Sequence, residues 1–180
     1  TPSQIELIHK TFGCTRYIYN QFVFENLENL ASNKDFVSAF DFSKRVNNDP
    51  NTPTWLKEVP SKAIKQSLIY ADRAFKDYFS KRSGKPKFKK KGYNESFYLI
   101  GTIKVERHRI FVPGLKWLRL KEFGYIPKNI SSVTISMKNG RYYISCLCKD
   151  EVDERIPLSD YNMGIDFGLK DQFITEDIVI

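Results

Sequence analysis

Apolar positions near the start of the chain follow the 3.6-residue period of an α-helix. Ile8, Phe12, Ile18 and Phe22 are spaced so that they share one helical face. The chain opens with Thr-Pro-Ser-Gln, which is typical of a helix start, with threonine as N-cap, proline at the first helical position and glutamine completing a capping box. The pattern predicts a helix that continues to about Leu30.

The same period predicts two further helices. Residues 36–47 form the shorter one, and the run 49–53, with its two prolines, breaks it. The next helix begins near Pro60 and is expected to continue to a stop at Gly84. The first half of the chain is therefore predicted to be helical.

After this glycine the period of the apolar positions changes to two, which is typical of β-strands. The alternating segments are 96–100, 102–106, 109–113, 115–120, 130–138 and 141–149. Asn139 and Gly140 separate the last two segments, and this dipeptide favours the positive φ angles of a type I′ hairpin turn. We therefore predict an α+β fold whose second half is an antiparallel sheet closed into a small barrel.

Charge is distributed unevenly along the 180 residues, whose formal net charge is +8. Residues 62–91 hold eleven bases against two aspartates, whereas residues 150–180 hold nine acids against two bases. The basic middle indicates a polyanionic partner, and the acidic end indicates a metal site or a solvated surface. No segment reaches the roughly 20 apolar residues of a membrane helix and no signal peptide opens the chain, so we expect no membrane partner.

The three cysteines argue against a zinc knuckle or a disulfide framework. Cys14 stands far from Cys146 and Cys148, which are two residues apart on one face of a predicted strand. The sequence contains no CxxC pair, the spacing typical of zinc ligands. We therefore predict a reducing, intracellular setting.

The basic segment, residues 81–91, combines seven bases with one aromatic side chain and contains no acid. Its candidate nucleic-acid-binding residues are Lys81, Arg82, Lys85, Lys87, Phe88, Lys89, Lys90 and Lys91. Gly84 and Pro86 prevent a helix here, so the lysines are predicted to lie along an extended chain that follows phosphates while Phe88 stacks on bases or sugars. The alternative is a solvated loop in which Phe88 only anchors the chain to the core.

The start of the third predicted helix is a second candidate surface. Its first turns carry four polar side chains, Ser61, Lys62, Lys65 and Gln66. Free N–H groups and the helix dipole favour a phosphate at such a position, and polar side chains there can reach base edges in a major groove. The alternative is that Ser61 caps the helix and the lysines are only solvated, and the residue types leave both interpretations open.

One carboxylate, that of Asp166, lies inside the apolar, strand-like run 164–169. A buried aspartate needs a metal ion or hydrogen-bond donors, because an unpartnered one is costly. Asp166 is therefore a candidate Mg²⁺ ligand, and an exposed aspartate at a turn is the alternative. A two-metal phosphodiester site needs several converging carboxylates, of which the chain offers one convincing candidate.

Eight short motifs follow one another at 55–61, 66–68, 74–79, 84–89, 96–98, 112–118, 133–136 and 164–171. They include Trp-Leu-Lys-Glu-Val-Pro-Ser, Gly-Lys-Pro-Lys-Phe-Lys and Gly-Ile-Asp-Phe-Gly-Leu-Lys-Asp. Together they resemble the first half of TnpB proteins, the transposon-encoded RNA-guided nucleases related to type V CRISPR effectors. The last motif resembles the family's first RuvC motif, in which leucine usually stands where this chain has Phe167.

The resemblance implies a small β-barrel wedge domain that is interrupted by a helical recognition insert and followed by an RNase H-like RuvC domain. On this chain it implies a helical recognition domain at 1–84, the barrel at 85–150, a linker at 151–161 and the truncated start of the RuvC domain at 162–180. The family's first barrel strand precedes the helix with which this chain begins.

The resemblance also implies Mg²⁺-dependent cleavage of double-stranded DNA that a bound guide RNA selects, beside a short DNA motif that the protein reads. Asp166 then matches a catalytic metal ligand, and Ser61, Lys62 and Lys65 lie where relatives face the DNA motif. No small-molecule substrate is implied, and the location would be the prokaryotic cytoplasm, with the nucleoid. The other RuvC carboxylates and the family's zinc motif do not occur in this chain.

Two other functions stay open. One is a shortened relative that binds DNA through a guide RNA as a regulator without nuclease activity, and the other is a plain RNA-binding module. With one RuvC carboxylate, the 180-residue chain alone is expected to bind nucleic acid without cutting it. The sequence thus leaves its status as an enzyme undecided.

Overall fold

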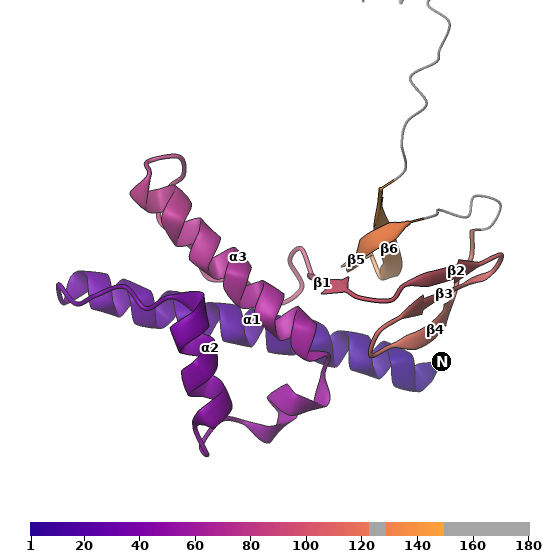
Figure 1. The fold of residues 1–180 in the computed structure, drawn as a ribbon, viewed down its shortest axis with the longest axis horizontal. Coiled ribbons are helices and arrows are strands. Elements are labelled where there is room, and N and C mark those ends of the chain that lie inside the picture. Colours follow the sequence, from indigo (N-terminus) through magenta and orange to yellow (C-terminus); the bar gives the residue numbers. More distant parts are fainter. Residues whose placement is uncertain (123–128, 150–180) are drawn as a thin grey trace, which may run out of the picture. The chain divides into compact units, whose positions relative to one another are not determined.

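The predicted helices are present in the computed structural model, which describes residues 1–122 and 129–149 (Figure 1). They are α1 at Pro2–Ala31, α2 at Ala39–Asn48 and α3 at Ser61–Phe79, with a 3₁₀ helix, η1, at Thr54–Glu58. The turn-rich run 49–53 separates α2 from η1 as expected, whereas η1 itself carries no periodic pattern that predicts it. None of the helices in these two ranges is long and apolar enough to cross a membrane.

The third helix ends at Phe79, before the glycine at which we expected it to stop. Lys81 adopts a positive φ of 58°, and the N–H group of Arg82 turns back to the carbonyl of Asp77 at 2.8 Å. This reversal satisfies a carbonyl at the helix end, so the helix needs no glycine to terminate. Gly84 instead lies in irregular chain beyond it.

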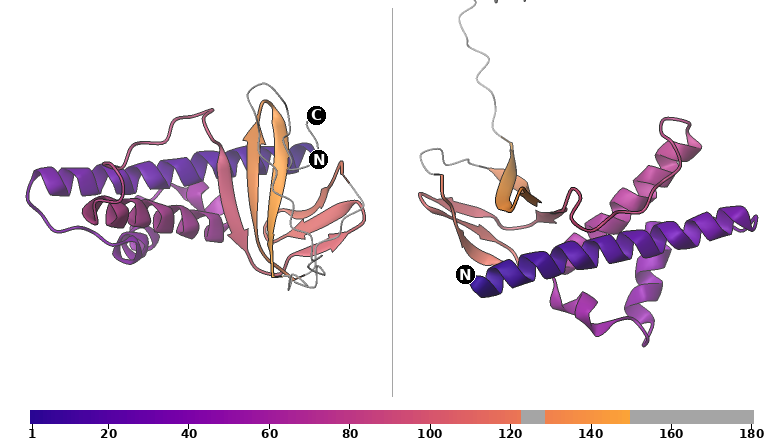
Figure 2. Two further views of the ribbon diagram at one scale, coloured as in Figure 1. Left: turned by 90° about the horizontal axis from the view of Figure 1, so that it is seen from above. Right: turned by 180° about the vertical axis from the view of Figure 1, so that it is seen from behind.

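Six strands follow in the described residues, and all of them are antiparallel (Figure 2). Their bounds are β1 Ser96–Ile100, β2 Lys104–Glu106, β3 Arg109–Val112, β4 Lys116–Arg119, β5 Ile130–Lys138 and β6 Arg141–Cys148. Each lies within a segment that the alternating pattern predicted. Asn139 and Gly140, with φ angles of 51° and 70°, form the predicted hairpin turn between β5 and β6.

The closed barrel that we predicted is wrong for the residues the structure describes. The strands form two separate three-stranded sheets, in the orders β1-β5-β6 and β2-β3-β4. The chain changes sheets at Gly101, directly after β1, where φ is +137°, a value that residues with a side chain rarely adopt. This bend prevents β1 from continuing straight into β2, so the alternating pattern yields two small sheets instead of one closed surface.

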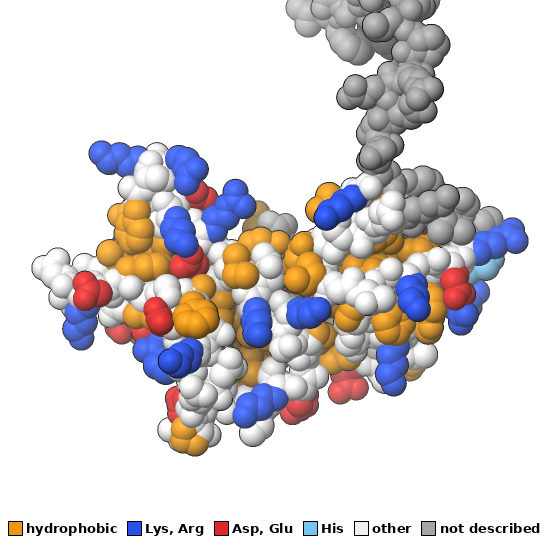
Figure 3. Space-filling model, in the orientation of Figure 1, with side chains coloured by type: hydrophobic (Ala, Val, Ile, Leu, Met, Phe, Trp, Pro, Cys, Tyr) orange, Lys and Arg blue, Asp and Glu red, His pale blue; other side chains and the backbone are white. Residues whose placement is uncertain are grey.

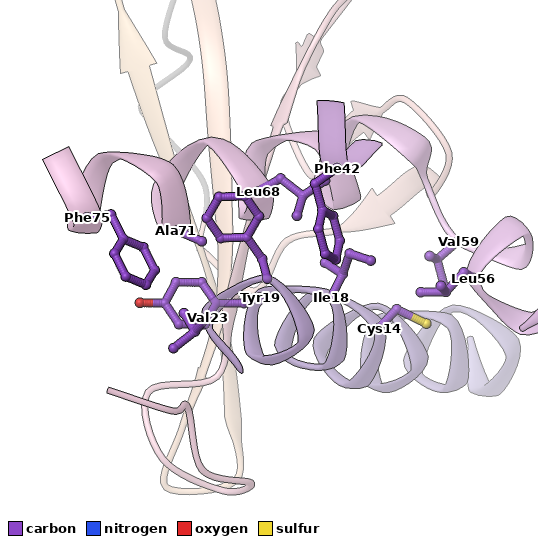
Figure 4. Close-up of a cluster of buried hydrophobic side chains, with 11 residues drawn as sticks. Cys14, Ile18, Tyr19, Val23, Phe42, Leu56, Val59, Leu68, Ala71 and Phe75 are labelled. Carbon is purple, nitrogen blue, oxygen red and sulfur yellow. The ribbon is translucent and has the colours of Figure 1, made fainter. Parts of the chain in front are cut away.

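A first cluster of buried side chains joins α1, α2, η1 and α3 (Figure 4). Its members are Cys14, Ile18, Tyr19, Phe22, Val23, Phe42, Leu56, Val59, Leu68, Ala71 and Phe75. Phe22 has no exposed surface, and its ring contacts those of Phe36, Phe42 and Phe75. Burying a phenylalanine contributes about 1.5–3 kcal/mol, so this cluster is the main reason why α2 and α3 pack on α1.

A second cluster joins the helices to both sheets. Its members are Ile8, Phe12, Ala63, Phe97, Leu99, Ile110, Val112, Leu115, Val133 and Ile135. Ile8 and Phe12 lie on α1, six and two residues before Cys14, with which the same helix enters the first cluster. One continuous helix therefore belongs to two hydrophobic cores.

Two contacts fix the helices against the turn between β3 and β4. The side-chain amide of Gln4 donates to the carbonyl oxygens of Leu115 at 2.9 Å and Trp117 at 2.8 Å. Gly114 lies against Pro60, so closely that a Cβ atom on the glycine would lie 2.7 Å from Cγ of the proline. Because φ of Gly114 is +84°, both the space and the backbone angle require glycine here.

We expect Gly114→Ala to lower the free energy of unfolding by about 1–3 kcal/mol, because alanine strains the backbone and collides with Pro60. Urea denaturation followed by circular dichroism measures the change. Gly84→Ala is the matched control, since an added Cβ there meets nothing within 4 Å, and it should stay within about 0.5 kcal/mol of the parent. Equal stabilities for the two variants would contradict the contact with Pro60.

A buried amide closes the loop between α1 and α2. Asn26 on α1 is fully buried, and its side chain accepts a hydrogen bond from the Val37 N–H group at 2.8 Å. The same side chain donates to the Val37 carbonyl at 3.2 Å. The side chain of Asn26 thus satisfies the N–H and C=O groups of Val37, which lies in a loop and has no helix or strand partner for them.

Asn26→Ala is expected to cost about 1–3 kcal/mol, because it leaves the backbone groups of Val37 unpaired. Thermal unfolding provides the measurement. Asn47→Ala, on an exposed position of α2, is the control and should change stability by no more than about 0.5 kcal/mol. Equal melting temperatures for Asn26→Ala and Asn47→Ala would show that the Asn26 amide does not hold the loop.

Candidate nucleic-acid interface

The basic segment continues from α3 into a stretch that we call the basic strap, residues 84–92, of which 84–90 have no regular secondary structure. Four of its lysines are exposed and make no ion pair or side-chain hydrogen bond with the described residues: Lys85, Lys87, Lys90 and Lys91. Phe88 is 50% exposed, and the buried residue of the strap is Pro86. The strap is therefore not helical, as predicted, and Phe88 is not its anchor to the core.

Lys89, in the middle of the predicted site, is engaged within the molecule. Its ammonium lies 4.3 Å from the ring centroid of Tyr19 on α1. Loss of hydration there lowers the pKa of Lys89 below its usual range. The structure therefore separates this lysine from its neighbours in the strap.

The first bases of the segment lie at the end of α3. Arg82 pairs with Asp77 at 3.0 Å and donates from Nε to the hydroxyl of Ser80 at 2.9 Å. Lys81 is exposed at the turn that ends the helix. Figure 3 shows the Lys and Arg side chains that gather around this end, with acidic side chains among them.

At the other end of α3, the three predicted residues are all exposed. No side chain caps this helix start, so the alternative in which Ser61 caps the helix is wrong on that point. Lys62 donates from Nζ to the carbonyl oxygen of Ile100, the last residue of β1, at 3.1 Å. Lys65 has no such partner in the described part of the chain. One lysine of the pair thus connects helix to sheet, and the other is available to a ligand.

We expect Lys62→Met to destabilise the fold by about 0.5–1.5 kcal/mol, because the Ile100 carbonyl loses its donor. Lys65→Met removes the same charge without a hydrogen bond and should stay within about 0.5 kcal/mol of the parent. Differential scanning calorimetry of the two variants decides the matter. Identical melting temperatures would show that the hydrogen bond of Lys62 contributes nothing.

The two candidate surfaces lie at opposite ends of one helix. The 19 residues of α3 span about 27 Å from Ser61 to Phe79 at 1.5 Å per residue, and Lys81 follows just beyond that end. Between these ends, Lys76 pairs with Asp72 at 2.6 Å and Arg73 lies 3.9 Å from Asp77. Along α3 and the segment that follows it, the bases without a carboxylate partner therefore lie near the helix start, at Lys81 and in the strap, and the structure does not bring all predicted residues into one patch.

Sequence reasoning missed the residues of α1 that hold the basic strap, which are Arg16, Tyr19 and Asn20. They recur at the spacing i, i+3 and i+4, which places them on one face of the helix. This polar face lies next to the apolar face, and the pattern by itself shows no partner for it.

No group of His, Cys, Asp or Glu side chains within residues 1–122 and 129–149 could hold a metal ion. The candidate Mg²⁺ ligand Asp166 lies outside these ranges, as do the linker and the acidic end of the chain. All three cysteines are free thiols, and burial raises the pKa of both Cys14 and Cys146. The described residues thus offer a candidate nucleic-acid surface, and the candidate metal ligand is not among them.

Comparison with known proteins shows which sequences the chain is similar to. Residues 1–35 match a family profile described as a helix-turn-helix domain, of the OrfB type. The chain is 32% identical over 161 residues to the protein of Escherichia coli K12 named "Putative RNA-guided DNA endonuclease InsQ", which covers 87% of this chain and 40% of that protein. The chain belongs to the TnpB family. A Streptomyces pristinaespiralis protein, "Putative RNA-guided DNA endonuclease", is 27% identical over 180 residues, covering 94% and 44% of the two chains.

This TnpB-family chain spans less than half the length of the two relatives. The residues that match the helix-turn-helix profile comprise α1 and the turn after it, while α2 begins beyond the match, at Ala39. Ten residues of α1 are buried against the two cores. Within the matched residues, α1 is therefore mainly a scaffold, and the exposed lysines of the strap and of the start of α3 lie outside the match.

Proposed function

We propose that the chain is the nucleic-acid-binding portion of an RNA-guided DNA endonuclease. The start of α3, with Ser61, Lys62 and Lys65, faces double-stranded DNA beside the target, and the basic strap contacts the phosphates of the guide RNA. The names of the two relatives support this assignment of partners. The division of the chain into a recognition part, a wedge part and the beginning of a RuvC domain belongs to the same proposal.

The observation that carries the proposal is the set of unpaired lysines. Surface lysines with nearby carboxylates are partly neutralised, as on the second half of α3. The lysines of the strap have no such partner in the described residues, and Phe88 stands exposed between them. A row of free cations around an exposed aromatic ring matches what a nucleic-acid strand offers, phosphates outside and bases or sugars inside.

The helix start supports the DNA contact. Exposed Ser61 and Lys65 flank the first turn of α3, and Lys62 holds that turn against β1. A helix end that is fixed to a sheet can meet a groove without being ordered first, which lowers the cost of binding. Serine and lysine side chains can both donate to acceptors on base edges and phosphates.

Catalysis belongs to the proposal as well. Asp166 is proposed as a metal ligand and catalytic carboxylate of the RuvC site, with Mg²⁺ as the ion that carboxylates of this kind bind. This assignment is supported by the motif at 164–171 and by the names of the relatives. The described residues add no further ligand to it.

Binding of the purified chain to two fluorescein-labelled probes, a mixed-sequence DNA duplex and an RNA hairpin, tests the proposal. Anisotropy titrations over a range of NaCl concentrations should show salt-dependent binding to both probes. Lys65→Met should lower the salt slope for the duplex by about one unit, since each lost phosphate contact removes roughly that amount. Lys44→Met, an exposed lysine on α2, is the matched control and should leave the slope unchanged.

The outcomes separate the alternatives. Binding to the RNA hairpin alone, with no effect of Lys65→Met, would favour the plain RNA-binding module. Equal losses for Lys65→Met and Lys44→Met would contradict a DNA-facing surface at the start of α3. Failure to bind either probe would refute the proposed function altogether.

A further inference from the structure

Three side chains on one face of α1 hold the basic strap, and we propose that they present its lysines to nucleic acid in a fixed arrangement. We call these contacts of Arg16, Tyr19 and Asn20 the α1 clasp. The inference rests on the proposed function and adds to it a positioning residue, Asn20, which makes no contact with nucleic acid itself.

Asn20 binds the strap through its backbone. Its side-chain oxygen accepts a hydrogen bond from the N–H group of Lys89 at 2.8 Å. Its side-chain nitrogen donates to the carbonyl oxygen of the same residue at 3.0 Å. One amide thus satisfies both backbone groups of Lys89, as a neighbouring strand would do in a β-sheet. Because only backbone atoms of Lys89 take part, the pairing does not depend on the side chain at that position.

Tyr19 adds a contact to the side chain of the same lysine. The tyrosine is 8% exposed, and the Lys89 ammonium lies over its ring. Such a cation–π contact contributes to stability only while the ammonium stays at the ring, so the charge of Lys89 is used within the molecule. The lowered pKa of Lys89 agrees with an ammonium that has lost hydration.

Arg16 fastens the strap where it ends. Its guanidinium pairs with the carboxylate of Glu95 at 3.1 Å, and both side chains are mostly buried, with 21% and 11% of their surface exposed. The same carboxylate oxygen accepts from the N–H group of Gly92 at 3.1 Å. Glu95 directly precedes β1, and it connects α1 to Gly92, the last residue of the strap.

The clasp fixes the backbone of the strap at two points and leaves its other side chains free. Arg82 and its pairing with Asp77 fix the chain before the strap begins. Between and beside these points stand the exposed residues Lys85, Lys87, Phe88, Lys90 and Lys91. Binding to a strap that is already ordered avoids the loss of backbone entropy that a free loop would undergo on meeting its ligand.

Limited trypsin digestion of the free protein tests the clasp without any ligand. Trypsin cuts after lysine in flexible chain, so Asn20→Ala should speed cleavage within the strap severalfold. Gln21→Ala is the matched control, because Gln21 is an exposed neighbour that lies beside α2 and not against the strap. Thermal unfolding of both variants excludes a general loss of stability. Equal cleavage rates in the two variants would overturn the clasp.

Binding to the fluorescein-labelled RNA hairpin then tests the consequence. Asn20→Ala should weaken the affinity by about tenfold, comparable to the cost of ordering one more backbone residue on binding, and should keep the salt slope of the parent. Lys87→Met should lower that slope by about one unit. Lys89→Met should lower it less than Lys87→Met, because the Lys89 ammonium already lies over Tyr19.

The results distinguish a failure of the positioning role of Asn20 from a failure of the proposed function. Faster cleavage of Asn20→Ala without any loss of affinity would overturn the inference and leave the proposed function intact. A reduced salt slope for Asn20→Ala would make it a direct contact and would also overturn its positioning role. Absence of hairpin binding by the parent chain would refute the strap's role as an RNA contact, together with the inference.

Discussion

The structure depends on α1 being one uninterrupted helix that enters two hydrophobic cores. Its first turns pack Ile8 and Phe12 under the sheets, and its later turns pack Phe22 among the other helices. Since a helix rises by a fixed amount per residue, the distance between the two cores is set by the number of residues between these side chains. Other parts of the chain are placed against this helix by apolar contacts or by side-chain amides such as those of Gln4 and Asn26.

Contacts with α1 and with its neighbouring elements also decide which bases of the chain are engaged within the molecule. Bases that touch α1 or a neighbouring element are used to join parts of the chain, as Lys62 joins α3 to β1 and Lys89 joins the strap to α1. In the strap and at the start of α3, the bases that have no carboxylate partner stay in solvent, and these form the candidate interface. An excess of positive charge is therefore not equivalent to a binding surface, because part of it is already committed to internal contacts.

Local patterns in the sequence predict much of this fold. The helical period, the alternation of apolar residues and the Asn-Gly turn place the three α-helices and the six strands, though not η1, because these signals act over a few residues. Contacts between distant residues are not visible in such patterns. The bend at Gly101, which packs against Lys62 and Pro113, and the attachment of Lys89 to Tyr19 depend on residues far along the chain. The early end of α3 comes from a local reversal at Lys81 and Arg82 that no periodic pattern marks. For the same reason the sequence identifies the bases of the candidate site without distinguishing free ones from engaged ones.

The placement of the two cores bears on the order in which the chain can fold as it is synthesised. Every buried member of the helical core lies within the first 75 residues, so that core can form while the strands are still being made. The second core cannot, because its members extend from Ile8 to Ile135. The hydrogen bond from Gln4 to Trp117 likewise joins residues that are 113 positions apart. Closing so long a loop is slow, and until then the first turns of α1 expose Ile8 and Phe12 to solvent. A nascent chain of this kind would pass through a stage in which half of its longest helix is folded against a finished core and the other half still lacks its partner.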